Sequence, residues 1–148
     1  METVKFPEPR SGLVIRYAYL WKHEWEQGRE DASKDRPCAV VMVLGSREGR
    51  YDVVALPITH SPPGSDTKAI EIPIETKQRL GLDSDRSWVV MSESNRFLWP
   101  GPDLRSLPNK DVSTVAYGML PPRFFEKVLR QFVEHIKQYR SVMVPRTE

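Results

Sequence analysis

Short apolar runs alternate with polar or proline-containing segments along most of the chain. The runs are rich in β-branched and aromatic residues, a pattern typical of short strands joined by turns. They predict strands over residues 12–21, 37–44, 51–58, 68–73, 87–91, 95–99 and 115–120. The run at 37–44 is continuously apolar, which indicates a strand buried on both faces.

The polar segments between these runs predict loops. Residues 45–50 form a turn that makes a β-hairpin of the two strands on either side of it. Residues 22–36 are almost wholly polar and predict a long exposed loop, and 100–111 predict a proline-rich loop. Residues 74–80 suit a short helix, because Gly81 follows them as a terminating glycine.

The hydrophobic period changes near the C-terminus. Residues 121–140 predict an amphipathic helix whose apolar side chains fall on one stripe: Phe124, Phe125, Val128, Leu129, Phe132, Val133, Ile136 and Tyr139. We expect this stripe to pack on the sheet rather than on a membrane surface. The chain is therefore predicted to be a single α+β domain, β-dominant, with a small curled sheet or barrel and a C-terminal helix.

Composition narrows the functional classes. Among 148 residues, 22 Lys and Arg stand against 20 Asp and Glu, a net charge of +2 that excludes a generic polycation but permits a local basic groove. The only cysteine, Cys38, excludes a disulfide framework and argues against a metal site. No apolar run reaches the roughly 18 residues that span a bilayer. We expect a cytoplasmic protein without a membrane partner or a cofactor.

Polar residues at the strand ends are the candidates for chemistry. Arg36 precedes the buried strand, and Thr59 follows its hairpin partner, so both side chains are expected at the same end of the sheet. An arginine beside a hydroxyl can hold a phosphate. The alternatives are a surface ion pair for Arg36 and a turn role for Thr59. His60 is a natural proton acceptor, or else a surface histidine.

The order of these features resembles the MazF/PemK family of bacterial toxins. The resemblance rests on Gly12, Gly28, Glu30, Arg36-Pro37, Pro57-Ile58-Thr59 and the segment Glu93-Ser94-Asn95-Arg96. It implies an SH3-like barrel over residues 1–148, with residues 1–11 as an N-terminal extension. It also implies metal-independent, sequence-specific cleavage of single-stranded RNA by attack of the ribose 2′-hydroxyl on the adjacent phosphate.

Carried onto this chain, the resemblance makes Arg36 and Thr59 catalytic candidates, with Glu30 and Arg96 beside them. Several relatives have an aspartate three positions after the second arginine, where this chain has Trp99. That departure leaves the general base open and makes His60 a candidate for it.

Aromatic and polar residues near these positions are candidates for binding RNA. Trp25, Phe97 and Trp99 are expected to stack on bases, and Glu93 and Asn95 to make polar contacts. For Trp25, the alternative is a loop residue packed onto the core.

The resemblance implies two protein partners. One is a second copy of the chain in a homodimer, and the other is a cognate antitoxin with an acidic, flexible segment. Two other functions remain open. One is a non-enzymatic toxin or adaptor that binds a protein target, as the gyrase-poisoning CcdB toxins do. The other is an RNA-binding relative that does not cleave.

Overall fold

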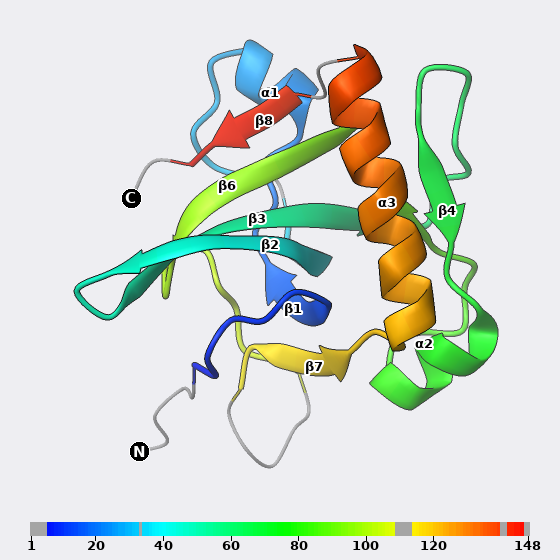
Figure 1. The fold of residues 1–148 in the computed structure, drawn as a ribbon, viewed down its shortest axis with the longest axis horizontal. Coiled ribbons are helices and arrows are strands. Elements are labelled where there is room, and N and C mark those ends of the chain that lie inside the picture. Colours follow the sequence, from blue (N-terminus) through cyan, green and yellow to red (C-terminus); the bar gives the residue numbers. More distant parts are fainter. Residues whose placement is uncertain (1–5, 33, 109–113, 140–141, 147–148) are drawn as a thin grey trace.

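A curled, eight-stranded sheet crossed by one long helix forms the body of the protein (Figure 1). The computed structural model describes residues 6–32, 34–108, 114–139 and 142–146. Its elements, in chain order, are β1 (Leu13–Tyr17), α1 (Lys22–Glu26), β2 (Arg36–Arg47), β3 (Arg50–Thr59), β4 (Ala69–Glu71), α2 (Ile74–Leu80), β5 (Trp88–Val90), β6 (Glu93–Trp99), β7 (Ala116–Met119), α3 (Pro122–Tyr139) and β8 (Val142–Pro145). The strands follow the order β4-β5-β3-β2-β1-β7, and β6 pairs with both β3 and β8.

This architecture confirms the predicted α+β, strand-dominated class with a C-terminal helix. The helix α3 lies within the predicted range 121–140, of which residue 140 is outside the described residues. The short helix α2 ends as predicted at Gly81, whose φ of +73° is in the left-handed region that favours glycine.

The antiparallel pair β2–β3 runs through the centre of the sheet, and both of its faces are buried. Ala39 and Val41 face a core cluster that contains Val128 of α3. Cys38 and Val40 face a second cluster on the other side. The predicted burial of the run 37–44 on both faces is therefore confirmed for residues 38–41, but it does not extend to the end of the run, where Leu44 is exposed. Burial also raises the pKa of the Cys38 thiol, which fits a packing role rather than a reactive one.

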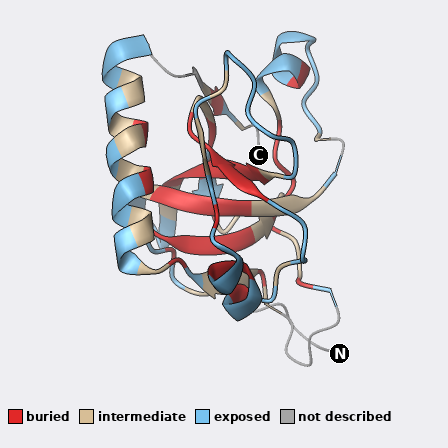
Figure 2. Ribbon diagram, turned by 90° about the vertical axis from the view of Figure 1, so that its right-hand side faces the viewer, coloured by how far each residue is buried: buried red, intermediate tan, exposed pale blue. Residues whose placement is uncertain are grey.

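The two clusters differ in what covers them. On one face, α3 turns its buried residues toward the sheet, with Phe132 fully buried (Figure 2). On the other face aliphatic side chains pack with four buried aromatic ones, and the rings of Tyr17 and Phe97 stack with their centroids 4.5 Å apart. The central strands are thus enclosed between a helix and a second cluster that contains these aromatic rings.

The predicted loop 22–36 is wrong in its first part, which forms the short helix α1. Glu24 accepts a hydrogen bond from the backbone N–H of Trp21 at 3.1 Å, and Arg29 pairs with the same carboxylate at 2.9 Å. The first contact gives the backbone N–H at the start of the helix a hydrogen-bond partner, and the second anchors the chain that leaves the helix. Local polar contacts stabilise this helix, and because it has no apolar stripe the sequence pattern did not predict it.

The predicted strand 12–21 ends early, at Tyr17. Beyond Tyr17 the chain leaves the strand pairing, because the buried side-chain amide of Asn95 forms hydrogen bonds with both the N–H and the C=O of Leu20. Asn95 Oδ1 accepts from Leu20 N at 2.9 Å, and Asn95 Nδ2 donates to Leu20 O at 2.7 Å. The segment stays in the core through a side chain rather than through strand pairing.

Strand β8, which the sequence pattern did not predict, pairs in parallel with β6 after the chain leaves α3. The next residue, Arg146, has a side chain only 2% exposed that pairs with Asp103 at 3.0 Å and donates to Tyr17 Oη at 3.2 Å. A buried arginine needs such partners. These contacts bind the end of the described chain to the rest of the fold.

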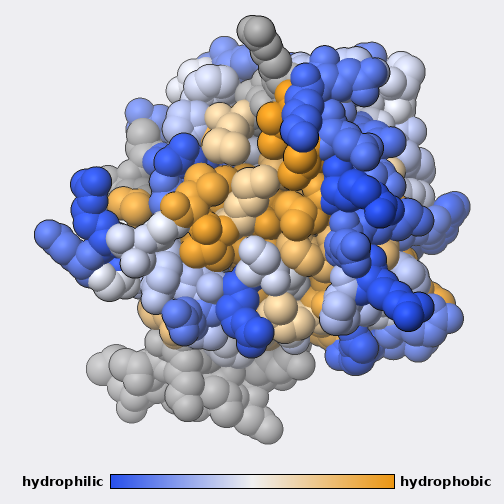
Figure 3. Space-filling model, in the orientation of Figure 1, coloured by the Kyte–Doolittle hydropathy of each residue, from blue (hydrophilic) through white to orange (hydrophobic). Residues whose placement is uncertain are grey.

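The outer face of α3 is hydrophilic, whereas hydrophobic side chains gather over the sheet beside it (Figure 3). Leu44 and Leu98 are among the exposed large hydrophobic residues. Among the helices of the described residues, none has the length and apolar character needed to cross a membrane.

We predict that Phe132→Ala destabilises the fold by about 3–5 kcal/mol, because it removes a fully buried ring and leaves a cavity between α3 and the sheet. Tyr139→Ala, on the same helix but 65% exposed, is the matched control and is expected to change stability by less than about 0.5 kcal/mol. Chemical denaturation of both variants measures the difference. Equal losses would contradict the packing described above.

Candidate functional site

A cavity of about 850 Å³ opens where β2 begins and β3 ends. Arg36, Thr59 and His60 all line it. The pairing of the two strands explains this, because Cys38 is opposite Pro57 and the residues beyond each of them continue to the same end of the sheet. The structure thus places three of the five candidate catalytic residues in one site.

Arg36 is held in the cavity wall by stacking and by a backbone contact. Its guanidinium carbon lies 4.8 Å from the ring centroid of Trp21, a cation–π contact. Its Nη1 donates to the carbonyl of Ile58 at a long 3.5 Å. Its Nε is buried and has no hydrogen-bond partner within the described part of the chain. The guanidinium is therefore positioned, and its Nη2 has no hydrogen bond to another described residue.

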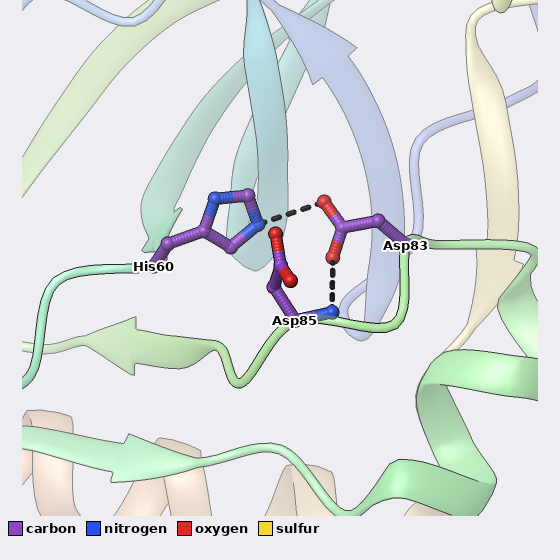
Figure 4. Close-up of side chains that lie close together, drawn as sticks. All are labelled: His60, Asp83 and Asp85. Atoms are coloured by element: carbon purple, nitrogen blue, oxygen red, sulfur yellow. Dashed lines mark hydrogen bonds and ion pairs between the residues drawn. The ribbon is translucent and has the colours of Figure 1, made fainter.

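Thr59 and His60 come directly from the end of β3. The hydroxyl of Thr59 accepts a hydrogen bond from the backbone N–H of Ser61 at 3.1 Å, which turns the chain at His60. The imidazole of His60 is 57% exposed, and its Nε2 lies 2.8 Å from Oδ2 of Asp83 (Figure 4). His60 is thus held by a carboxylate at the cavity wall.

Asp83 is itself held by a buried lysine. Lys77 Nζ, in α2, contacts Asp83 Oδ1 at 2.6 Å and Ser87 Oγ at 2.7 Å, and it also donates to the carbonyl of Asp85. The Lys77 residue is only 1% exposed. Partial burial acts to raise the pKa of Asp83, but the bonds and charges of Lys77 and His60 outweigh it, so this pKa is lowered. Asp83 is a carboxylate at neutral pH.

His60, Asp83 and Asp85 form the cluster that comes nearest to a metal site among the described residues. Their candidate ligand atoms lie within 4.8 Å of one another. However, both oxygens of Asp83 already accept bonds, one from His60 and the other from the ammonium of Lys77. A cation at this position would face a fixed positive charge and would have to break the His60–Asp83 contact. The donor set fits a hydrogen-bonded His–Asp pair better than a metal.

Glu93 contributes a partly buried carboxyl group to the same cavity. Its Oε1 accepts from Lys22 N at 2.8 Å and from Tyr19 Oη at 3.1 Å. Burial raises the pKa of Glu93, although these two donors act in the opposite direction. Because Lys22 adjoins the Trp21 that stacks on Arg36, this carboxyl group belongs to the Arg36 side of the cavity.

The charges of the cavity wall leave an excess of positive charge near Arg36. Arg16 lies 3.8 Å from Asp35, and Lys77 is paired with Asp83, so these cations are neutralised locally. In the described ranges, Arg36 and Lys34 line the cavity without an ion-pair partner, and the carboxyl group of Glu93 on the same side offsets only part of their charge. Such a wall attracts an anion even though the net charge of the chain is small.

The other candidate catalytic residues lie outside this cavity. Arg96 is on the exposed face of β6 and forms a close ion pair with Asp52. Glu30 lines a second, smaller cavity of about 200 Å³, together with the exposed Trp25. The resemblance had implied that Glu30 and Arg96 lie beside Arg36. Neither of them lines the large cavity.

Most of the residues predicted to bind RNA are part of the core. Phe97 and Trp99 point into the aromatic cluster and are 3% and 2% exposed. Trp99 Nε1 donates to the carbonyl of Pro7 at 3.0 Å, so both the ring and its polar atom are used by the fold. Asn95 is fully buried and holds Leu20. These three side chains are not available to a base, and Glu93 is the member of the set that lines the large cavity.

Sequence reasoning missed Lys77 and Asp83. Lys77 lies in α2 and Asp83 in the segment that connects α2 to β5, and β5 reaches the site by pairing Trp88 with Thr59. This strand pairing brings Asp83 to His60. The spacing of the residues in the sequence does not predict it.

Comparison of the chain with protein-family models, with curated proteins and with solved structures finds no match. The site is therefore interpreted from its own geometry.

We predict that Glu93→Gln stabilises the protein at neutral pH. The pKa of Glu93 is raised in the folded state, so its contribution to stability is largest in acid and is lost as the pH rises through that pKa. Glutamine can still accept from Tyr19 and Lys22 but has no charge to desolvate. The gain in melting temperature should shrink in mildly acidic buffer.

The matched control is Glu71→Gln, at an exposed carboxylate whose pKa is lowered by its bonds to Arg86. This variant is not expected to stabilise the protein at neutral pH. A stability difference for Glu93→Gln that does not change with pH would contradict the assignment of a desolvated carboxyl group.

Proposed function

We propose that the protein is a metal-independent endoribonuclease that cleaves single-stranded RNA at specific sequences. The observation that carries this proposal is the meeting of Arg36, Thr59 and His60 on the wall of one cavity. A phosphate ligand, a hydroxyl group and a proton acceptor are the set that cleavage through a 2′-hydroxyl requires. The resemblance of the Arg-Pro and Pro-Ile-Thr segments to MazF/PemK toxins supports the same reaction.

Arg36 binds the scissile phosphate in this proposal. Its stacking on Trp21 fixes the plane of the guanidinium, and its Nη2, which bonds no described residue, is the donor offered to an oxygen of the phosphate. As the 2′-oxygen attacks phosphorus, negative charge grows on the phosphoryl oxygens. A positioned cation stabilises that charge more than it stabilises the ground state. The Thr59 hydroxyl, beside it at the strand end, orients the same group.

His60 accepts the proton of the 2′-hydroxyl. The bond from the 2′-oxygen to phosphorus forms while the bond to the 5′-oxygen breaks, and the products are a 2′,3′-cyclic phosphate and a 5′-hydroxyl. The leaving oxygen takes up a proton from water while Arg36 donates a hydrogen bond to it. No metal ion takes part in this sequence of steps.

Glu93 supplies a base-recognition group in this proposal. Its carboxyl group reaches the cavity beside the Trp21–Lys22 segment, and carboxylates accept hydrogen bonds from the amino groups of bases. Sequence preference would then depend on Glu93 rather than on Asn95, Phe97 or Trp99. Stacking on Trp25 would require the RNA to extend to the second cavity.

The resemblance adds two partners to the proposal, a second copy of the chain and an antitoxin. An acidic antitoxin segment would compete with RNA for Arg36 and Lys34, which are the unpaired cations of the cavity wall among the described residues. Sedimentation of the purified chain tests the homodimer, since a species of only 17.1 kDa would contradict it.

The purified protein is expected to cut a long, defined single-stranded RNA in the presence of a chelator. Arg36→Gln should lower kcat/KM by roughly 100-fold or more, because it removes the cation that meets the phosphate. Arg86→Gln, at an exposed arginine outside the cavity, is the matched control and should cleave like the wild type.

Two substrates complete this test. A 2′-deoxy nucleotide at the mapped cut site should block cleavage, because the attacking hydroxyl is absent. Cleavage of the deoxy substrate, or a requirement for a divalent metal, would overturn the proposed reaction. Salt-dependent RNA binding without any product would indicate a non-cleaving RNA-binding protein instead.

A further inference from the structure

We propose that Asp83 is the positioning residue of this site, holding His60 in the tautomer whose Nδ1 is free to accept the proton of the substrate. This inference rests on the proposed RNA cleavage and adds a residue outside the motifs that suggested it. Asp83 is 23 positions after His60 in the sequence, and the two meet only in the folded chain.

The contact between the two side chains determines which nitrogen carries the proton. Oδ2 of Asp83 is a carboxylate oxygen and can only accept, so His60 Nε2, at 2.8 Å, must donate. The neutral imidazole then has its lone pair on Nδ1. Figure 4 shows this second nitrogen turned away from both aspartates. The pair therefore presents an acceptor nitrogen rather than a donor.

The carboxylate of Asp83 is fixed by two donors on its other oxygen. Lys77 Nζ lies 2.6 Å from Oδ1, and the backbone N–H of Asp85 donates to the same atom at 3.2 Å. Burying a lysine is costly unless it is fully bonded. The ammonium of Lys77 is fully bonded, because it donates to Asp83, to Ser87 Oγ and to the carbonyl of Asp85. Its bonds hold the loop after α2 in the shape that presents Asp83 to His60.

The two halves of the pair are brought together by the sheet. His60 follows the last residue of β3, and the loop that carries Asp83 leads into β5. The pairing of Thr59 with Trp88 fixes the separation of these two segments. In the free protein the pair is exposed to water, and exposed pairs contribute little to stability. RNA in the cavity excludes that water and strengthens the interaction during the reaction.

Asp83→Asn provides a decisive variant, because the amide that it introduces has one preferred orientation. Lys77 and the Asp85 N–H both require an acceptor, so the amide must turn its oxygen toward them and its amino group toward His60. Nε2 of His60 then becomes the acceptor, and the hydrogen moves to Nδ1. The substituted side chain keeps its size and its bonds to the loop, but the nitrogen left for the substrate can no longer accept a proton.

The first readout of this variant is spectroscopic and independent of activity. Long-range ¹H–¹⁵N spectra of the neutral imidazole should show the Nε2–H tautomer for His60 in the wild type and the Nδ1–H tautomer in Asp83→Asn. His60→Gln identifies the signals. Asp85→Asn is the matched control, since no bond in the described structure joins the Asp85 side chain to His60, and it should retain the wild-type tautomer. A wild-type Nδ1–H tautomer would overturn the inference.

The second readout is kinetic. Asp83→Asn should lower kcat by roughly 100-fold, in the range expected for loss of a general base, and leave KM within about twofold. Asp85→Asn should leave both unchanged. In His60→Ala, added imidazole should restore part of the rate, which a purely structural role for His60 would not allow.

The outcomes separate this inference from the proposed function. A wild-type protein that does not cut RNA overturns the two together. In an active protein, an Asp83→Asn variant with unchanged kcat overturns the role of Asp83 alone and leaves the role of Arg36 standing. Activity that appears only on addition of a divalent metal, and disappears in both Asp83→Asn and Asp85→Asn, would show that the cluster is a metal site and would overturn the inference.

Discussion

The register of the β2–β3 pair controls both the core and the candidate site. Alternate residues of β2 face two different clusters, one covered by α3 and the other containing the stacked rings of Tyr17 and Phe97. A shift of one residue would exchange the two faces, so that side chains fitted to one buried cluster would be forced into the other. The same register sets the distance between Arg36 and Thr59, which lie beyond the pair Cys38–Pro57. The packing that stabilises the sheet therefore also positions Arg36 and Thr59, and neither can move without loss of core contacts.

A second strand pairing completes the site. The short strand β5 pairs with the last residues of β3, and the loop before it brings Asp83 to His60. Only three residues long, β5 could not hold that loop alone. The buried Lys77 of α2 supplies the missing constraint through its bonds to Asp83, Asp85 and Ser87. One wall of the cavity thus depends on strand register, and the other depends on a polar network around a lysine.

These two sources of order explain what the sequence could predict. Apolar runs and a 3.6-residue period are local patterns, and they were enough for the central strands and for α3. Hairpin geometry was enough to bring Arg36 and Thr59 together. The sequence also predicts which side chains of β6 share a face, because in a strand Phe97 and Trp99 lie on one face and Arg96 on the other. Placing all three in one site was inconsistent with that alternation. By contrast, β8 and the His60–Asp83 contact depend on pairings between distant segments, which no local pattern encodes.

The polar groups around the cavity support the proposal that it is a functional site rather than a packing defect. A hydrophobic lining would be more stable than a desolvated Glu93, a buried Lys77 and an arginine whose Nε has no partner among the described residues. Proteins retain such groups where function needs them, at a cost in stability. Each of these groups is also held by specific contacts, so that Arg36 stacks on Trp21 and Asp83 is fixed from its far side. For the proposed reaction, these fixed charges are the preorganisation that a charged transition state requires, because they are oriented before the substrate arrives.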